Sequence, residues 1–177
     1  MSLRLLVPST LALAPVRDPR AQTNPTWAET EDVYLLATFF DENTGLRLAT
    51  SPDGLAWEKL HGGRPLLVPR VGGKLMRDPC LHRGPDGTFH LVWTLSWQGR
   101  SIGYARSMDL IHWSDQQEIV LMGAGFETGN TWAPEIRYDR TREEFMLYWS
   151  ASPDRKDFKR SRCERTVGPS IAGVHRR

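Results

Sequence analysis

The sequence predicts an all-β protein built from β-propeller blades. Two observations support this: a repeat with a 56-residue period whose segments look like strands, and no sustained helical periodicity. The segment "VYLLATF" begins at Val33, "FHLVWTL" at Phe89 and "FMLYWSA" at Phe145. Repeats of about 40 to 50 residues made of several short strands are typical of propeller blades, and longer loops account for the greater length here.

A second string repeats at the same offset. "LATSPDGLAWEKL" aligns with "YARSMDLIHWSDQ", which places Asp53 over Asp109 and Trp57 over Trp113. Aspartates in such segments commonly bond to the backbone of a turn, so we expect both to stabilise turns. We expect both tryptophans to pack between blades.

The repeat stops after about Ser152, because the expected A-x-S-x-D motif does not occur near residue 161. The predicted organisation is therefore a leader or weakly signal-like segment over 1–30, a partial propeller over 31–152, and a basic tail over 153–177 outside the repeat. This gives about two and a half to three blades. A closed ring needs at least about four, so exposed blade faces predict self-association.

Composition limits the partners. The net charge is +2 and the basic residues gather at the end of the chain, so we expect no nucleic-acid partner. No run of about 18 apolar residues exists, so we expect no membrane span. The five histidines lack ligand spacing, and Cys80 and Cys163 are expected to be free thiols. No metal and no cofactor is predicted.

The segment "MSLRLLVPSTLALAPV" has an early arginine and a short apolar run, as secretion signals do, but prolines interrupt it. A signal and a disordered leader are both left open. The compartment is therefore left unassigned between secreted or periplasmic and cytoplasmic.

Two acid and proline pairs draw attention to Asp78 in "MRDPCLH" and Glu135 in "NTWAPEIRYD". Asp78 lies 11 residues before Phe89, and Glu135 lies 10 before Phe145, so they take nearly equivalent places in successive blades. Each is expected at the start of a first, innermost strand, facing one central funnel. The residue before a proline is disfavoured in the helical region, so Asp78 is expected to have an extended backbone.

Two carboxylates at one funnel fit glycoside hydrolysis. One protonates the leaving oxygen, and the other activates water or stabilises the transition state, at a separation of about 6.5–9.5 Å in inverting enzymes. From spacing alone, ordinary turn or strand-start hydrogen bonds are the favoured interpretation for both acids, because most acids near turns are structural.

Aromatic residues near these acids are candidates for sugar contact. Trp132 precedes Pro134 by two residues, and Trp97 follows the second strand of its repeat. An aromatic face can stack on a sugar ring, although a buried strand tryptophan is also compatible with Trp132. Trp93 is expected in the core and Arg77 in the wall of the funnel.

The strings "LMRDPCLHRGPDGTFHLVWT", "IGYARSMDLIHWSDQQ" and "NTWAPEIRYD" resemble motifs of two successive blades in glycoside hydrolase family 43. The similarity runs from about Val33 to Ser152. It implies a five-bladed propeller, of which this chain would hold the N-terminal part, and inverting hydrolysis of terminal arabinofuranosyl or xylosyl residues in plant-type glycans. It also implies that Asp78 and Glu135 are catalytic, without saying which is acid, base or orienting group.

The sequence departs from this pattern in one respect. Family members usually have a third carboxylate, the base, in the first blade. Here the candidates are Asp18, whose spacing fits poorly, and Asp41 and Glu42 in "FFDENTG". A chain that is inactive because it is truncated, and a non-catalytic carbohydrate-binding or interaction propeller fragment, therefore remain the alternatives.

Overall fold

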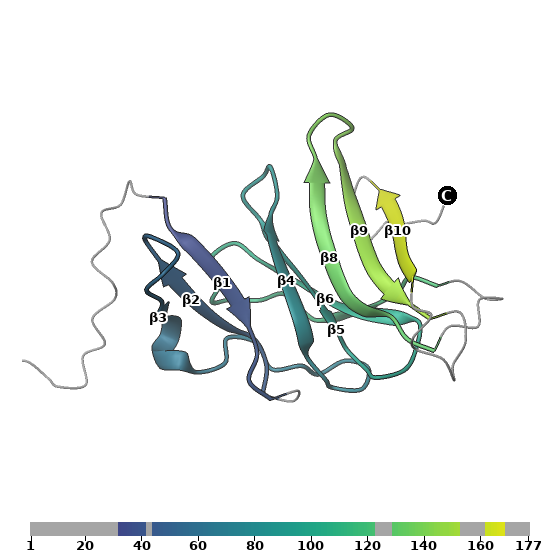
Figure 1. The fold of residues 1–177 in the computed structure, drawn as a ribbon, viewed down its shortest axis with the longest axis horizontal. Coiled ribbons are helices and arrows are strands. Elements are labelled where there is room, and N and C mark those ends of the chain that lie inside the picture. The colour runs from purple at the N-terminus through teal and green to yellow at the C-terminus, as the bar shows by residue number, and fades with distance from the viewer. Residues whose placement is uncertain (1–31, 42–43, 123–128, 153–161, 169–177) are drawn as a thin grey trace, which may run out of the picture. The chain divides into compact units, whose positions relative to one another are not determined.

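The computed structural model describes residues 32–41, 44–122, 129–152 and 162–168. These residues form three antiparallel sheets and one short 3₁₀ helix, which confirms the all-β prediction (Figure 1). The first sheet has the order β1-β2-β3, the middle sheet β4-β5-β6-β7 and the third sheet β10-β9-β8. The bounds are β1 (Tyr34–Thr38), β2 (Arg47–Ser51), β3 (Glu58–Lys59), η1 (Leu60–Gly63), β4 (Arg77–Arg83), β5 (Phe89–Thr94), β6 (Ser101–Ser107), β7 (Gln117–Val120), β8 (Trp132–Asp139), β9 (Glu144–Ala151) and β10 (Arg162–Gly168).

The three aligned segments of the repeat become β1, β5 and β9. Strand β5 pairs with β4 and β6, and β9 pairs with β8 and β10. Among the described residues β1 pairs with β2 alone. The repeat therefore marks the second strand of a blade, and β4 and β8 are the first strands of the next two.

Strand β10 lies inside the segment predicted to be a tail outside the repeat. It pairs with β9 from Arg162 opposite Ala151 to Gly168 opposite Phe145. The domain boundaries at residues 30 and 152 stay predictions, and the predicted leader over 1–30 lies outside the described residues.

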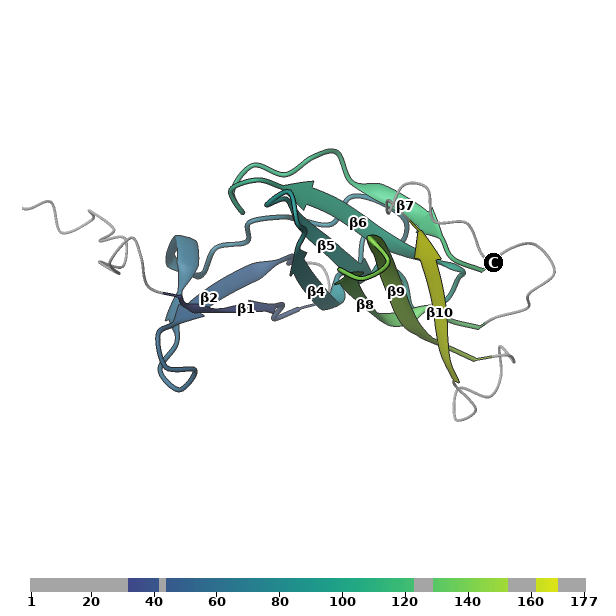
Figure 2. The same cartoon turned by 90° about the horizontal axis from the view of Figure 1, so that it is seen from above.

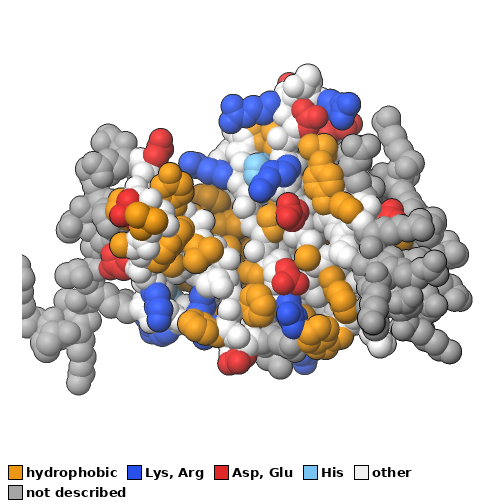
Figure 3. All heavy atoms as spheres, viewed as in Figure 1, with side chains coloured by type: hydrophobic (Ala, Val, Ile, Leu, Met, Phe, Trp, Pro, Cys, Tyr) orange, Lys and Arg blue, Asp and Glu red, His pale blue; other side chains and the backbone are white. Residues whose placement is uncertain are grey.

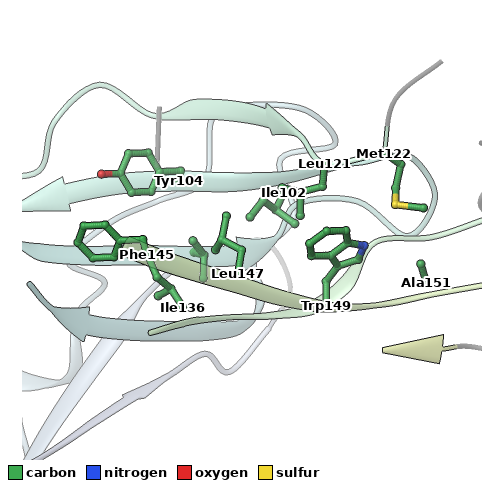
Figure 4. Close-up of a cluster of buried hydrophobic side chains, with 10 residues drawn as sticks. Ile102, Tyr104, Leu121, Met122, Ile136, Phe145, Leu147, Trp149 and Ala151 are labelled. Carbon is green, nitrogen blue, oxygen red and sulfur yellow. The ribbon is translucent and has the colours of Figure 1, made fainter. Parts of the chain in front are cut away.

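The core consists of two clusters, one on each face of the middle sheet. Val92 faces the cluster shared with the third sheet, whereas its neighbours Leu91 and Trp93 face the cluster shared with the first sheet. This follows from strand geometry, since successive side chains point to opposite faces. Figure 4 shows Ile102 and Tyr104 of β6 opposite side chains of the third sheet, among them Ile136 and Leu147. Three sheets thus stack face to face, as seen from above in Figure 2.

Trp93 is fully buried, which confirms its predicted place in the core. It lies across β6 at Gly103, the residue with which it pairs. A Cβ atom at Gly103 would overlap the Trp93 indole. Glycine is therefore required here by the close approach of the ring rather than by its backbone.

The predicted turn roles of Asp53 and Asp109 are confirmed. Asp53 Oδ1 accepts hydrogen bonds from the backbone nitrogens of Leu55 (2.8 Å) and Ala56 (3.0 Å). Asp109 Oδ1 accepts the matching pair from Ile111 (2.9 Å) and His112 (2.8 Å). Hydrogen bonds from the backbone hold the pKa of Asp53 below its ordinary value. The pKa of Asp109 is also lowered, mainly by the hydrogen bond from the His112 side chain.

The two repeated tryptophans differ. Trp113 is half-buried and packs against the cluster between the first and middle sheets. The core prediction is wrong for Trp57, which is 41% exposed. Its indole instead bonds to the preceding turn, where Nε1 donates to the carbonyl of Gly54 (3.2 Å). Trp113 Nε1 donates in the same way to the carbonyl of Leu110 (3.2 Å).

Two histidines sit in the seam between the middle and third sheets. His82 Nε2 accepts a hydrogen bond from the backbone nitrogen of Tyr138 (3.1 Å), and His90 Nδ1 lies 2.9 Å from the hydroxyl of Tyr104. His90 also packs against Phe145, with ring centroids 4.7 Å apart. Burial is the main cause that lowers the pKa of both histidines.

This seam predicts a loss of stability in acid. Since the folded protein favours the neutral form of both rings, it binds fewer protons than the unfolded chain just below the ordinary histidine pKa of about 6.5. The contribution is present above that pH and is lost as the pH falls through the lower folded-state values. Urea unfolding midpoints measured between pH 7.5 and 5.0 should fall less steeply for His90→Gln than for the parent. His61→Gln, at an exposed histidine, is the control; an equal fall in all three proteins would contradict the assignment.

Candidate functional site

The site begins with a β-bulge that occurs in both first strands. Pairing of β4 with β5 shifts register between Arg77 and Cys80, and pairing of β8 with β9 shifts between Trp132 and Glu135. Pro79 and Pro134 lie within the two bulges. Proline has no N–H to donate to a neighbouring strand, so within sheets it occurs at bulges and on edge strands, as here.

The residue before each proline has a positive φ. The angle is +48° at Asp78 and +46° at Ala133. The extended backbone expected at Asp78 is therefore wrong. A non-glycine residue in this region is held there by its surroundings, and such positions gather at functional sites.

The structure also corrects the match between the two acids. Cys80 pairs with Val92, and Glu135 pairs with Tyr148, which is the next repeat of Val92. Glu135 therefore takes the place of Cys80, and Asp78 corresponds to Ala133. The loop between paired Tyr138 and Phe145 is one residue longer than that between Arg83 and Phe89, which made the spacings look nearly equal.

A single hydroxyl links the two bulges. Thr94 Oγ1, at the end of β5, donates to Asp78 Oδ2 (3.2 Å) and accepts from the backbone nitrogen of Ala133 (2.9 Å). Thr94 is 1% exposed. The carboxylate of Asp78 and the bulge that precedes Glu135 thus share one hydrogen-bond partner across two sheets.

Strands β4 and β8 lie side by side (Figure 1). Asp78 and Glu135, one on each strand, are both exposed. Burial raises the pKa of the Cys80 thiol, and the negative charge of Glu135 raises it further, while Ile136 and Arg137 oppose these effects. Figure 3 shows acidic and basic side chains over the middle of this face and hydrophobic side chains over the first sheet.

The two candidate tryptophans contact each other. Trp97 and Trp132 pack edge to face with centroids 6.0 Å apart, and Trp132 Nε1 donates to the carbonyl of Trp97 (2.9 Å). The Arg77 guanidinium lies 4.5 Å from the centre of the Trp97 ring. Trp97 is 47% exposed, whereas Trp132 is half-buried. Trp97 thus has the larger surface for a ligand.

Thr94 was not singled out from the sequence, although a signal existed. Thr38, Thr94 and Ser150 recur at one position of the repeat, which puts a hydroxyl at that point of each sheet. The contact between Thr94 and Ala133 joins two sheets, so no reading of one repeat could reveal it.

The third carboxylate is not brought to this site by a described contact. Asp18 and Glu42 lie outside the described residues. Asp41 lies in the turn after β1, where its carbonyl accepts from the Thr44 hydroxyl (3.0 Å). Within the described ranges no group of three or more His, Cys, Asp or Glu residues could hold a metal ion. Cys80 and Cys163 are free thiols, as predicted.

Stacked antiparallel sheets whose first strands lie side by side define part of a β-propeller. The chain belongs to a family related to glycoside hydrolase family 43, described as "Probable glycosyl hydrolase domain", whose model matches residues 29–167. This confirms the resemblance seen in the sequence. A search of curated proteins finds no match to the chain.

Two solved glycoside hydrolases share the fold. An endo-1,4-beta-xylanase from Bacteroides thetaiotaomicron superposes with a TM-score of 0.59 and 16% identity, covering 82% of this chain and 52% of its own. An alpha-L-arabinofuranosidase from Clostridium thermocellum superposes with a TM-score of 0.55 and 14% identity, and the match covers 76% of this chain and 44% of the arabinofuranosidase. An exo-beta-1,3-galactanase from Phanerochaete chrysosporium matches less well, with a TM-score of 0.47 and 14% identity, over 55% of this chain and 24% of the galactanase. The chain thus spans about half or less of the length of these structures.

No helix among the residues described here has the length and apolar character needed to cross a bilayer.

Proposed function

We propose that the protein hydrolyses terminal arabinofuranosyl or xylosyl residues of plant-type glycans with inversion, using Asp78 and Glu135. The observation that carries the proposal is the shared hydroxyl: Thr94 binds the Asp78 carboxylate and the backbone two residues before Glu135. Two exposed carboxylates on adjacent first strands support the proposal, because glycoside hydrolysis uses an acid and a base on either side of one bond.

Trp97 is proposed as the sugar-stacking surface of this site. Its exposed ring lies next to Arg77, which directly precedes Asp78 in β4. Trp132 buttresses it from the third sheet through the edge-to-face contact and the bond from its Nε1. A ring held in place this way can contact the apolar face of a pentose without a large ordering cost.

The test is turnover of aryl arabinofuranosides and aryl xylosides by the purified protein, followed by release of the aryl alcohol. We expect hydrolysis of one of the two, with aryl glucosides and galactosides as the comparison. The product anomer, followed by NMR during early turnover, should be inverted. No release from any substrate would contradict the proposal.

A non-catalytic carbohydrate-binding role is the second candidate. The observation that favours it is that the described residues bring two carboxylates to the site, where the family resemblance implies three. Calorimetric titration with arabinose, xylose and their oligosaccharides separates the two functions, because binding without turnover supports this second role alone. Self-association through exposed blade faces stays a prediction, testable by sedimentation.

A further inference from the structure

We propose that Thr94 is the positioning residue that sets Asp78 and the Glu135 segment relative to each other; this inference rests on the proposed function. Its hydroxyl hydrogen-bonds to both bulges. The chemistry assigned to Thr94 is orientation. It contacts neither a sugar nor a reacting atom.

The direction of the two hydrogen bonds is fixed. The backbone nitrogen of Ala133 can only donate, so Thr94 Oγ1 accepts there and turns its own hydrogen toward the Asp78 carboxylate. A hydroxyl polarised by one bond donates more strongly in the next, which strengthens the hold on the carboxylate. A hydroxyl at this point therefore orders both partners at once.

Burial makes this role specific to the hydroxyl. Thr94 is 1% exposed, so water cannot easily replace its oxygen. In a Thr94→Val variant the valine would fill the same space, but the Ala133 nitrogen would lose its acceptor and the Asp78 carboxylate would lose a donor. Both bulges hold a non-glycine residue at positive φ, and such a conformation persists only when its surroundings enforce it.

Corresponding residues show what the position does elsewhere. Thr38 occupies it in the first sheet, where its hydroxyl donates to the carbonyl of Phe39 (3.3 Å). Ser150 occupies it in the third sheet, opposite Trp132, where Ala133 stands in the place of Asp78. The described contacts of these two hydroxyls include no carboxylate. Thr38 therefore supplies a matched control for removal of a hydroxyl at the same place in the repeat.

The experiment compares Thr94→Val, Thr94→Ser and Thr38→Val in the full chain. Amide hydrogen exchange and ¹H–¹⁵N chemical shifts at Ala133 report the two hydrogen bonds of Thr94, here called the bridge, and they require no turnover. Thr94→Val should lose protection of the Ala133 amide, whereas Thr94→Ser and Thr38→Val should keep it. Asp78→Ala should also shift the Ala133 amide through the shared hydroxyl, and Asp109→Ala should not.

Kinetics then test the effect on catalysis. Small misplacements of a reacting group lower rates steeply, so Thr94→Val should lose at least about tenfold in kcat, while KM changes by less than about threefold. Thr94→Ser should restore most of the rate. A thermal unfolding curve for each variant excludes a folding defect as the cause.

The outcomes separate this inference from the proposed function. An Ala133 amide that is unchanged in Thr94→Val overturns the bridge, whether or not the protein turns over a glycoside. Where the parent is active, a parental kcat in Thr94→Val overturns the positioning role. If the parent shows no turnover and Thr94→Val loses protection of the Ala133 amide, the shared hydrogen bonds are confirmed, and their catalytic purpose is refuted together with the proposed function.

Discussion

Replacing Asp78 with asparagine, or Glu135 with glutamine, is expected to lower kcat for glycoside hydrolysis by about 10²- to 10⁴-fold, the usual contribution of a positioned acid or base. Both substitutions keep the shape of the side chain and remove its ability to exchange a proton. Both positions are exposed, so little change in folding is expected. Initial rates on the aryl glycoside turned over by the parent provide the measurement.

The leaving group can assign the two roles. Departure of dinitrophenolate needs no proton, whereas departure of a sugar hydroxyl does. The variant that lacks the general acid should therefore keep much more activity on the dinitrophenyl glycoside than on a disaccharide, and the other variant should lose both alike. Glu143→Gln, an exposed acid in the loop between β8 and β9, is the control. Parental rates in either Asp78→Asn or Glu135→Gln would contradict the site.

The second large effect is expected in the core. Trp93→Ala should lower the free energy of unfolding by about 3–5 kcal/mol, as truncation of large buried rings commonly does. Trp93 lies in the cluster that joins the first and middle sheets, together with Leu46 and Leu48 on the facing side. The cavity would therefore weaken the packing of two sheets at once, and urea unfolding would show it.

Trp57→Ala provides the comparison for this loss. Trp57 is 41% exposed and lies between a bend and β3, so its removal should cost less than about 1 kcal/mol, as at other surface positions. Losses of similar size in the two variants would contradict the assignment of Trp93 to the core and of Trp57 to the surface.

The repeat in the sequence predicted most of the fold. Segments with one spacing became β1, β5 and β9. Asp53 and Asp109 were predictable because their bonds reach only two or three residues along the chain. Local rules suffice where the partners are local.

The candidate site was less predictable because its geometry depends on partners far along the chain. The rule for residues before proline missed the positive φ of Asp78, which lies in a bulge set by pairing with β5. Counting residues from Phe89 and Phe145 missed the longer second loop, and so aligned Glu135 with the wrong residue. Thr94 joins partners 16 and 39 residues away, which no sequence pattern shows.

The whole account requires that the two carboxylates act as a unit on one glycosidic bond. The rate of the double variant Asp78→Asn/Glu135→Gln tests this most directly, because groups that act together lose their effects together. We expect its kcat to fall no further than that of the slower single variant. A double variant in which the two losses multiply would show that the two carboxylates act independently, and would contradict the shared site.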